Sequence, residues 1–590
     1  MNAIDQNNYI KMLQFGKTLS EDFLLKFDSM PKLRIGVLAN FASQNFTHVL
    51  KASIFNSGFS SFIYEAEYDS ADLEIYDDNS NLYQFKPDLV FLGTAVQQYR
   101  HRYFSCKTAE EKEQFSKHYL DNVLRLVDTL TSKGIRCIVS NLSLPSERMF
   151  GNFGLITQQS LYGSVLDFNN NLVIAAGAKN ISILDIMYLS AQIGFSNFID
   201  ERLWVSAKYL TNNKFLPIVT KNLATQIAVL KGKVKKCIVL DLDNTLWGGI
   251  IGDDGINGIK LGHADAYSEA FQIFQSYILS LKLRGFILAV CSKNNYETAV
   301  SVFRNHPDMI LKEDDIAVFI ANWEDKASNI QTISKTLNIG LDSLIFIDDS
   351  PFERNLVKSL LPEVAVPEMP EDVTDYISVI EKSGILEASN FSKEDVHRNQ
   401  MYREESLRSN ELVHFTNIDE YLQSLQIQAT CSSFMPEDMS RVTQLLQRSN
   451  QFNLRTQRYD EAGCTQFMID PNTYFTLTIR IRDKFGDYGL ISVLCGEIEN
   501  NILKINELVM SCRVLKRGVE EFLMNKVINF CSSRKLSGIQ GEYIESSKNA
   551  MVKDFYKTYG FSCIESYDGR HIWFLESKNF QIFKNFIKEV

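Results

Sequence analysis

Residues 238–246 read Ile-Val-Leu-Asp-Leu-Asp-Asn-Thr-Leu, an apolar, β-branched run that ends in two carboxylates two residues apart. Because side chains alternate along a strand, Asp241 and Asp243 would share one face just past a buried parallel strand. Open α/β sheets bind ligands at this edge, and buried like charges persist where a cation or a proton neutralises them. The run predicts an Mg²⁺ site with one carboxylate free to attack phosphorus. The alternative is a strand that ends in a solvated acidic turn.

Three further elements follow in an order that would complete a phosphotransfer site. They are an apolar strand ending at Ser292, Lys326 at the start of a helical pattern, and a strand over 344–347 that ends in Asp348 and Asp349. A hydroxyl, a point positive charge and a further carboxylate pair suit phosphoryl oxygens and a divalent cation. Each alone has a plainer interpretation, Ser292 as a helix N-cap and Lys326 as a surface lysine. Their order favours the functional interpretation.

In this order the elements resemble motifs I to IV of the haloacid dehalogenase (HAD) superfamily, and the resemblance implies roles. The implied catalytic residues are Asp241 as the nucleophile that becomes an aspartyl phosphate, Asp243 as general acid and base, and Lys326. The implied Mg²⁺ ligands are Asp241, Asp348 and the backbone carbonyl of Asp243, with Asp349 in support. The candidates for substrate binding are Ser292, Lys293, Asn294 and Thr245, and Thr245 would also help to position Asp243.

Four stretches narrow the resemblance to the FkbH-like group, HAD subfamily IIIC. They are residues 246–255 (LWGGIIGDDG), 291–294 (CSKN), 348–355 (DDSPFERN) and 483–489 (DKFGDYG). The resemblance covers the chain beyond about residue 30. It implies a degenerate SGNH-hydrolase-like region before the HAD core and an acetyltransferase-like (GNAT) domain after it.

Cys291 has two interpretations. FkbH-like proteins of polyketide pathways dephosphorylate 1,3-bisphosphoglycerate and pass its glyceryl unit through a cysteine thioester to an acyl carrier protein. Cys291 lies beside Ser292, and Lys293 with Mg²⁺ could lower the pKa of its thiol. In the alternative, Cys291 is a small apolar residue that closes the strand, and alternation puts it on the face opposite Ser292.

The sequence predicts a multi-domain α/β protein. We expect an SGNH-like α/β domain over 1–225, a HAD core over 226–370, a helical linker over 371–425 with helices at 372–386 and 393–409, and a GNAT-like α+β domain over 426–590. Candidate strands over 33–38, 89–93 and 135–140 alternate with helical patterns in the first part, which is typical of a parallel sheet.

The N-terminal part lacks the residues of a serine hydrolase. Residues 39–43 read Ala-Asn-Phe-Ala-Ser where Gly-Asp-Ser would stand, and residues 200–203 lack the terminal Asp-x-x-His. We therefore expect Ser43, Gly93 and Asn141 to be structural, and the domain to serve recognition or docking.

No large cap domain is inserted between the first two HAD motifs. Residues 247–262 are Gly-rich with turn signals, which predicts a small β flap with Trp247 near the mouth of the site. A site without a bulky cap is open, which suits large or protein-tethered substrates.

Residues 505–518 resemble the strand, loop and helix start that bind the pyrophosphate of coenzyme A in GNAT enzymes. The family pattern is Arg/Gln-x-x-Gly-x-Gly/Ala, whereas residues 513–519 read Arg-Val-Leu-Lys-Arg-Gly-Val, with Lys516 in place of the first glycine. Binding of coenzyme A is therefore in question, and an acyl chain, a phosphopantetheine arm or a carrier protein is an equal alternative.

Composition excludes several classes of protein. The net charge of −11, without a dominant basic block, argues against non-specific nucleic-acid binding. Ten cysteines without Cys-x-x-Cys or Cys/His spacing indicate reduced thiols in the cytoplasm. The start of the chain is polar and no apolar run reaches membrane-spanning length, so we expect no signal peptide and no membrane insertion.

The sequence thus predicts a cytoplasmic, Mg²⁺-dependent HAD phosphatase or phosphotransferase that acts on a phosphorylated small molecule, in biosynthesis of a secondary metabolite or a surface polysaccharide. One alternative is an FkbH-type glyceryl transferase with an acyl carrier protein as its partner. A second is a non-catalytic, carrier-binding assembly protein, against which the intact set of motifs argues.

Overall fold

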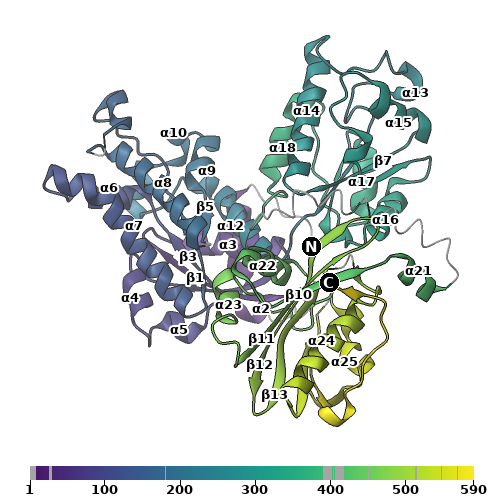
Figure 1. The fold of residues 1–590 in the computed structure, drawn as a ribbon. Helices are drawn as coiled ribbons and strands as arrows, with labels where there is room; N and C mark the ends of the chain where they lie inside the picture. Colours follow the sequence, from purple (N-terminus) through teal and green to yellow (C-terminus); the bar gives the residue numbers. More distant parts are fainter. Residues whose placement is uncertain are drawn as a thin grey trace. The chain divides into compact units, whose positions relative to one another are not determined.

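The computed structural model divides the chain into two compact units, residues 1–229 and 230–590 (Figure 1). The structure describes residues 8–24, 30–157, 159–179, 181–389, 402, 404, 417–449, 451–511, 514–546, 548–567 and 569–590. The predicted helix over 372–386 corresponds to α18, Tyr376–Ser383, while the one over 393–409 lies almost wholly outside the described residues.

The first unit is built on a five-stranded parallel sheet in the order β2-β1-β3-β4-β5. Its strands are β1 Lys32–Ala39, β2 Ser60–Glu65, β3 Leu89–Gly93, β4 Arg136–Ser140 and β5 Ser182–Leu184. The predicted strands over 33–38, 89–93 and 135–140 are confirmed as β1, β3 and β4. The pattern missed β2, in which four of the six residues are serine or aromatic, and the three-residue β5.

Helices connect these strands. They are α1 Tyr9–Thr18, α2 Glu21–Leu24, α3 Gln44–Asn56, α4 Ala71–Tyr76, α5 Asn81–Phe85, α6 Val96–Phe104, α7 Ala109–Ser132, α8 Leu161–Lys179, α9 Ile186–Ile193, α10 Phe195–Phe198, α11 Glu201–Ala207 and α12 Leu216–Leu230. The longest, α7, begins with a capping box between Thr108 and Glu111, which satisfies backbone N–H groups that its first turn leaves free.

The residues that stand where a serine hydrolase would have its motifs make structural contacts. The Ser43 hydroxyl donates a hydrogen bond of 2.8 Å to Glu65, and the Asn141 amide donates one of 2.7 Å to Asp185. A side chain at Gly93 would meet the ring of Phe41. These contacts agree with the structural interpretation of all three residues.

The HAD part of the second unit is a four-stranded parallel sheet in the order β8-β7-β6-β9. Its elements are β6 Cys237–Leu240, α13 Ile251–Asp254, α14 Ala266–Leu283, β7 Ile287–Ser292, α15 Tyr296–Asn305, β8 Val318–Ala321, α16 Lys326–Thr336, β9 Leu344–Ile347 and α17 Pro351–Leu360. Alternate residues of the sheet pack on α14 and α15 on one face and on α16 and α17 on the other, which matches the continuous apolar runs of its strands.

The register of this sheet brings the motif residues to one edge. Leu240, the last residue of β6, is paired with Val290 of β7 and Ile347 of β9. The residues that follow these three strands therefore leave the sheet side by side.

The segment after β6 differs from the predicted β flap. It forms a single antiparallel bridge, between Gly248 and Lys260, and the short helix α13. Trp247 is fully buried against the core and not placed at the mouth of the site. The prediction was wrong on this point because the buried apolar surface offered by α14 and α15 outweighs the turn propensity of the glycines.

The C-terminal part is a mixed sheet in the order β15-β16-β14-β13-β12-β11-β10-β17. Its elements are α21 Ile418–Ser424, β10 Gln428–Ser432, α22 Met439–Arg448, α23 Glu461–Gln466, β11 Tyr474–Arg482, β12 Asp487–Glu499, β13 Ile502–Met510, α24 Val519–Ser533, β14 Gly538–Ile544, α25 Phe555–Thr558, β15 Ser562–Tyr567, β16 Arg570–Glu576 and β17 Lys588–Glu589. The pairs β13–β14 and β10–β17 are parallel and the others antiparallel, as an α+β domain requires.

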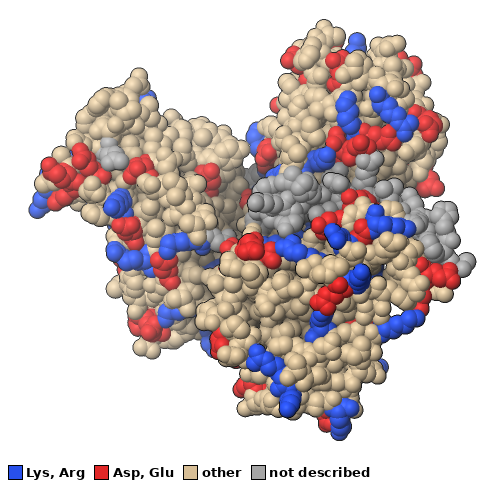
Figure 2. Space-filling model, in the orientation of Figure 1, with Lys and Arg blue, Asp and Glu red and all other residues tan. Residues whose placement is uncertain are grey.

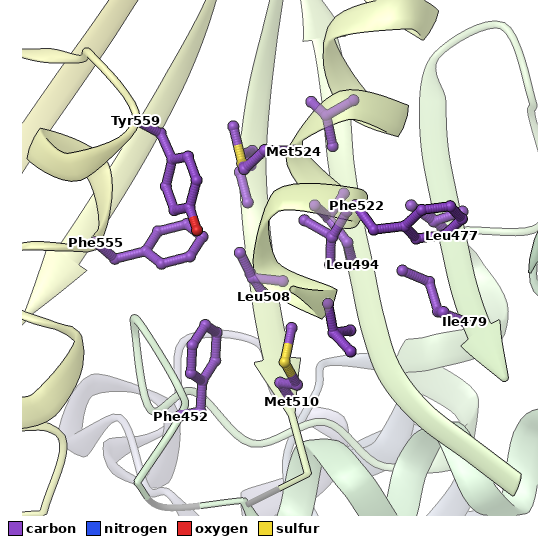
Figure 3. Close-up of a cluster of buried hydrophobic side chains, with 14 of the residues drawn as sticks. Phe452, Leu477, Ile479, Leu494, Leu508, Met510, Phe522, Met524, Phe555 and Tyr559 are labelled. Atoms are coloured by element: carbon purple, nitrogen blue, oxygen red, sulfur yellow. The ribbon is translucent and has the colours of Figure 1, made fainter. Parts of the chain in front are cut away.

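One face of this sheet packs against α24. Figure 3 shows Leu494 and Leu508 of the sheet facing Phe522 and Met524 of the helix, all of them buried. Phe452 and Phe555 extend the same cluster, and their ring centroids lie 5.4 Å apart. This core is the principal source of stability of the domain, since buried apolar surface dominates folding.

Glu507 of β13 is a fully buried carboxylate on the other face of the sheet. Neither oxygen of Glu507 accepts a hydrogen bond. Arg455 Nη1 lies 4.0 Å from Glu507 Oε1, and the Nε of Arg455 pairs with Glu542 at 2.6 Å. Burial, opposed only in part by Arg455, raises the pKa of Glu507 to about 8.

We expect Glu507→Gln to stabilise the protein at high pH. The unfolded carboxyl, with an ordinary pKa of 4.5, releases its proton before the folded one, so stability falls between about pH 4.5 and pH 8. A raised pKa of this size corresponds to a few kcal/mol, about 1.4 kcal/mol per unit. Unfolding temperatures of wild type and variant should coincide at about pH 5 and separate toward about pH 9. Exposed Glu545→Gln is the control, and a gap that does not depend on pH would contradict the prediction.

Charged side chains of both signs are interspersed on the face seen in Figure 2. Among the described residues, no helix combines the length and the hydropathy needed to cross a bilayer.

Candidate active site

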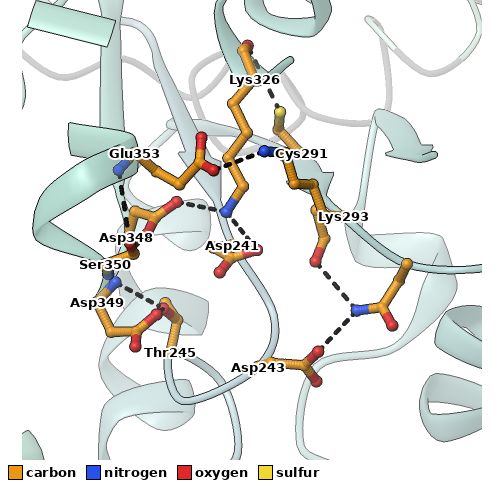
Figure 4. A network of polar contacts seen from close by, with 12 residues as sticks. Asp241, Asp243, Thr245, Cys291, Lys293, Lys326, Asp348, Asp349, Ser350 and Glu353 are labelled. Atoms are coloured by element: carbon orange, nitrogen blue, oxygen red, sulfur yellow. Dashed lines mark hydrogen bonds and ion pairs between the residues drawn. The ribbon is translucent and has the colours of Figure 1, made fainter. Parts of the chain in front are cut away.

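Asp241 lies directly after β6, at the carboxyl edge of the HAD sheet (Figure 4). Its backbone N–H donates a hydrogen bond of 3.0 Å to the carbonyl of Ile347, the last residue of β9. Asp241 is 6% exposed. The sheet therefore fixes a nearly buried carboxylate at this edge.

Lys326 joins two of the predicted acidic residues. It begins α16, whose N-cap Asp325 accepts a hydrogen bond of 2.8 Å from the N–H of Ser328. Its Nζ lies 3.0 Å from Asp241 Oδ1 and 2.5 Å from Asp348 Oδ2. Burial alone would lower the pKa of Lys326, but the two carboxylates outweigh it and raise the pKa. The lysine is therefore a fixed positive charge between them.

Asp348 and Asp349 follow β9 and are held by α17. The backbone N–H of Ser350, the N-cap of α17, donates 2.8 Å to Asp348 Oδ1. Burial, and then the charge of Asp241, raise the pKa of Asp348 in the absence of a further cation. This accumulation of buried negative charge requires a partner beyond Lys326.

Arg354 is a residue whose role the sequence analysis did not recognise. It is buried on α17, and its Nη1 donates to the carbonyl oxygens of Asp348 at 2.8 Å and Asp349 at 2.6 Å. It thus fixes the backbone of both acidic residues. A signal was present in the sequence, because an arginine on the first helix after a carboxylate pair can turn back to that loop.

Asp243 makes contacts different from those of Asp241. Its Oδ1 accepts from the indole Nε1 of Trp247 at 2.9 Å and from the N–H of Ile251 at 3.1 Å. Its Oδ2 accepts 2.9 Å from Asn294 Nδ2. Burial raises the pKa of Asp243, although these three donors act in the opposite direction. The side chain is oriented without help from the lysine.

The resemblance implied that Thr245 positions Asp243, but Thr245 contacts Asp349 instead. Its hydroxyl accepts 3.2 Å from the backbone N–H of Asp349 and lies 3.4 Å from Asp349 Oδ1. The backbone explains the difference. Asn244 has a left-handed φ of 54°, which turns the chain between the two positions.

The structure divides the predicted substrate-binding residues. Ser292 is buried at the end of β7. The Nδ2 of Asn294 donates to the Ser292 hydroxyl at 3.2 Å and also to Asp243. Lys293 turns away and pairs with Glu353 of α17 at 2.7 Å. Ser292 and Asn294 thus lie at the site, while Lys293 links two elements of its rim.

Cys291 is fully buried on the face opposite Ser292, packed with Val239 and Ala289. Its Sγ lies 3.8 Å from the backbone carbonyl of Lys326. Burial raises the pKa of its thiol to about 12, whereas a nucleophilic thiolate needs a lowered pKa. The structure fits the apolar interpretation, and the acyl-acceptor role of Cys291 stays a prediction.

The site fits a magnesium ion. Carboxylate oxygens of Asp241, Asp348 and Asp349 lie within 4.8 Å of one another, and Asp241 and Asp348 are buried. Oxygen donors in such an arrangement are those that Mg²⁺ prefers. Asp349, predicted as a supporting residue, is part of this carboxylate group, whereas the side chain of Asp243 is not.

Comparisons with known proteins agree with this geometry. The family model "FkbH, N-terminal domain" matches residues 34–228. The solved structure of the N-terminal part of BF1531 from Bacteroides fragilis, described as containing a phosphatase domain complexed with Mg, is 34% identical with a TM-score of 0.61. The match covers 65% of this chain and 100% of that one.

Two acetyltransferases match the other end. The ribosomal-protein-S18-alanine N-acetyltransferase of Escherichia coli is 14% identical, covering 25% of this chain and 94% of its own, with a TM-score of 0.21. Ard1 of Thermoplasma volcanium is 17% identical, covering 25% and 97%, with a TM-score of 0.21. No curated protein matches the chain.

Three findings agree. A solved relative at 34% identity is matched over its whole length, the FkbH N-terminal domain matches residues 34–228, and the four motifs meet at one sheet edge. The chain belongs to the FkbH-like family of the HAD superfamily.

Proposed function

We propose that this protein is an Mg²⁺-dependent phosphatase or phosphotransferase that acts through an aspartyl phosphate on Asp241. The observation that carries the proposal is the Asp241 carboxylate itself. It is almost buried, and its Oδ1 pairs with Lys326 Nζ at 3.0 Å. With Oδ1 held by the ammonium group, Oδ2 is the oxygen that would attack phosphorus.

In the first step, an oxygen of Asp241 forms a bond to phosphorus while the bond from phosphorus to the leaving oxygen breaks. Asp243, in its protonated form, gives its proton to that oxygen. Lys326 and the hydroxyl and amide of Ser292 and Asn294 bind the phosphoryl oxygens. Asp241, Asp348 and Asp349 would hold Mg²⁺, which would supply positive charge beside the phosphoryl group.

In the second step, Asp243 takes a proton from a water molecule, whose oxygen bonds to phosphorus. The bond from phosphorus to Asp241 breaks, which releases phosphate and restores the carboxylate. Trp247, Ile251 and Asn294 hold Asp243 for both proton transfers. Arg354 keeps the loop of Asp348 and Asp349 in place throughout.

Asp243→Asn should trap the covalent intermediate. With p-nitrophenyl phosphate the leaving group needs no proton, so the first step proceeds, while loss of the base slows the second by about 10²–10⁴-fold. Intact-mass spectrometry after an acid quench should show one added phosphoryl group, located by digestion to residues 238–246. The Asn294 amide can rotate to accept from the new amide, so the fold should be retained.

The double variant Asp241→Asn/Asp243→Asn is the control for the trapping experiment and should carry no adduct. Turnover by Asp243→Asn without an adduct at any time would show that phosphate is not transferred through Asp241.

The substrate we propose is a phosphorylated small molecule in the biosynthesis of a secondary metabolite or a surface polysaccharide. The FkbH N-terminal match supports the alternative of glyceryl transfer from 1,3-bisphosphoglycerate to an acyl carrier protein. The two differ in product. Phosphate release with no acyl adduct on protein supports hydrolysis, and a glyceryl adduct on an added carrier protein supports transfer.

A further inference from the structure

The loop after β13 places a carboxylate where a phosphate would bind. A helix N-terminus attracts anions, and α24 begins at Val519 directly after this loop. The N–H of Lys516 donates 2.9 Å to Glu520 Oε1. Burial raises the pKa of Glu520, and its other oxygen is buried without a hydrogen bond. The carboxyl group of Glu520 thus occupies an N–H group of this loop, and a second acidic residue, Glu521, lies beside it in the first turn of α24.

The backbone conformation of Lys516 in this loop is also unusual for a residue other than glycine. Lys516 has a φ of 61°, a left-handed conformation that glycine adopts without strain and other residues rarely do. The bond to Glu520 therefore holds a backbone geometry that the sequence at this position opposes. The neighbouring Arg517 donates to the hydroxyl of Tyr488 of β12. The guanidinium group of Arg517 is thereby engaged within the domain.

A second observation concerns the gap between β13 and β14. In the part of the chain that the structure describes, these parallel strands pair only over Ile502–Lys504 and Gly538–Gln540. Beyond that point the wedge segment, residues 452–455, lies between them. The N–H of Met510 on β13 donates 3.2 Å to Phe452 O, and the N–H of Ile544 on β14 donates 2.8 Å to Leu454 O.

The wedge segment is firmly held. Asn453 forms an antiparallel bridge with Val509, and its carbonyl accepts 2.9 Å from Asn549 Nδ2. The side chains of Phe452 and Leu454 are buried in the core on the α24 side, where Figure 3 shows Phe452 beside Phe555 and Met510. The segment thus completes the sheet where its two strands separate.

These two features close the routes by which the nucleotide-linked donor of an acetyltransferase fold would bind. An extended arm with amide groups binds to a sheet by pairing with free strand edges, and the wedge segment already pairs with both edges. A diphosphate needs free N–H groups and positive potential. Glu520 accepts from the N–H of Lys516, and the acidic pair Glu520 and Glu521 does not favour a further anion. We propose that the C-terminal domain does not bind coenzyme A, because its own chain occupies both positions.

The test uses the full chain with coenzyme A and with acetyl-coenzyme A. Calorimetry at ligand concentrations up to about 1 mM should show no saturable binding, beside an acetyltransferase of known affinity as positive control. Hydrogen exchange followed by mass spectrometry should show no ligand-dependent change over 452–455 and 514–520. Binding that changes exchange in either segment would overturn the proposal. Binding that leaves both unchanged lies elsewhere and supports it.

A matched pair of variants tests the role of Glu520 directly. Glu520→Gln weakens the acceptor of the Lys516 N–H, whereas Glu521→Gln changes the adjacent residue, which accepts from the hydroxyl of Tyr559 at 3.2 Å. We expect several-fold faster exchange in the peptide containing Lys516 for Glu520→Gln alone. Equal exchange in the two variants would show that Glu520 does not hold the loop, and would contradict the proposal for the diphosphate position.

Discussion

Asp241→Asn is expected to reduce Mg²⁺-dependent phosphate release by about 10⁴-fold or more, because it removes the atom that attacks phosphorus. The substitution keeps the shape of the side chain and removes one of two carboxylates beside Lys326. The ion pair between Lys326 and Asp348, at 2.5 Å, stays in place. We therefore expect a folded but inactive protein, measured by phosphate release together with an unfolding curve.

The matched control for this experiment is Asp253→Asn. Asp253 lies exposed on the segment between the first two motifs and should leave turnover unchanged. Residual turnover by Asp241→Asn within about tenfold of wild type would show that another group accepts the phosphoryl unit, and the proposed mechanism would fail.

Lys326→Met is expected to affect both stability and activity. Removal of the ammonium leaves Asp241 and Asp348 as neighbouring buried carboxylates without a cation, and breaking a buried pair in this way costs about 3–5 kcal/mol. Since the ion also binds these carboxylates in our proposal, Mg²⁺ should raise the unfolding temperature of the variant more than that of wild type. Phosphate release should fall by about 10²–10³-fold.

Lys335→Met provides the control, because Lys335 is exposed in the last turn of the same helix. It should change neither quantity. An unfolding temperature of Lys326→Met equal to that of wild type without Mg²⁺ would contradict the ion-pair account of this lysine.

The HAD core was predictable because its signals are local. Apolar runs identified β6, β7 and β9, and a parallel sheet brings the residues after its strands to one edge whatever the connections are. Asp241, Ser292, Lys326 and Asp348 consequently lie where the motifs placed them. β8, Val318–Ala321, was missed; it follows the acidic turn Glu313–Asp315.

The contacts of Asp243 and Thr245 could not be predicted in the same way. They depend on the left-handed turn at Asn244 and on the burial of Trp247, whose indole then donates to Asp243. Turn signals in the glycine-rich segment predicted a flap, whereas packing against α14 and α15 drew the segment into the core. The glycine-rich pattern correctly predicted turns, but it did not predict which surface the segment would pack against.

By itself, the sequence determined the sheet edge, its acidic residues and its lysine, since strand alternation and motif order follow from neighbouring residues. The tertiary structure decided which oxygen of Asp241 faces Lys326, which donors hold Asp243, and that Arg354 fixes the Asp348–Asp349 loop. It also joined Glu520 to the N–H of Lys516 and placed the wedge segment between β13 and β14. The physical reason is that burial and hydrogen bonding join residues far apart in the chain, and no local pattern encodes those pairs.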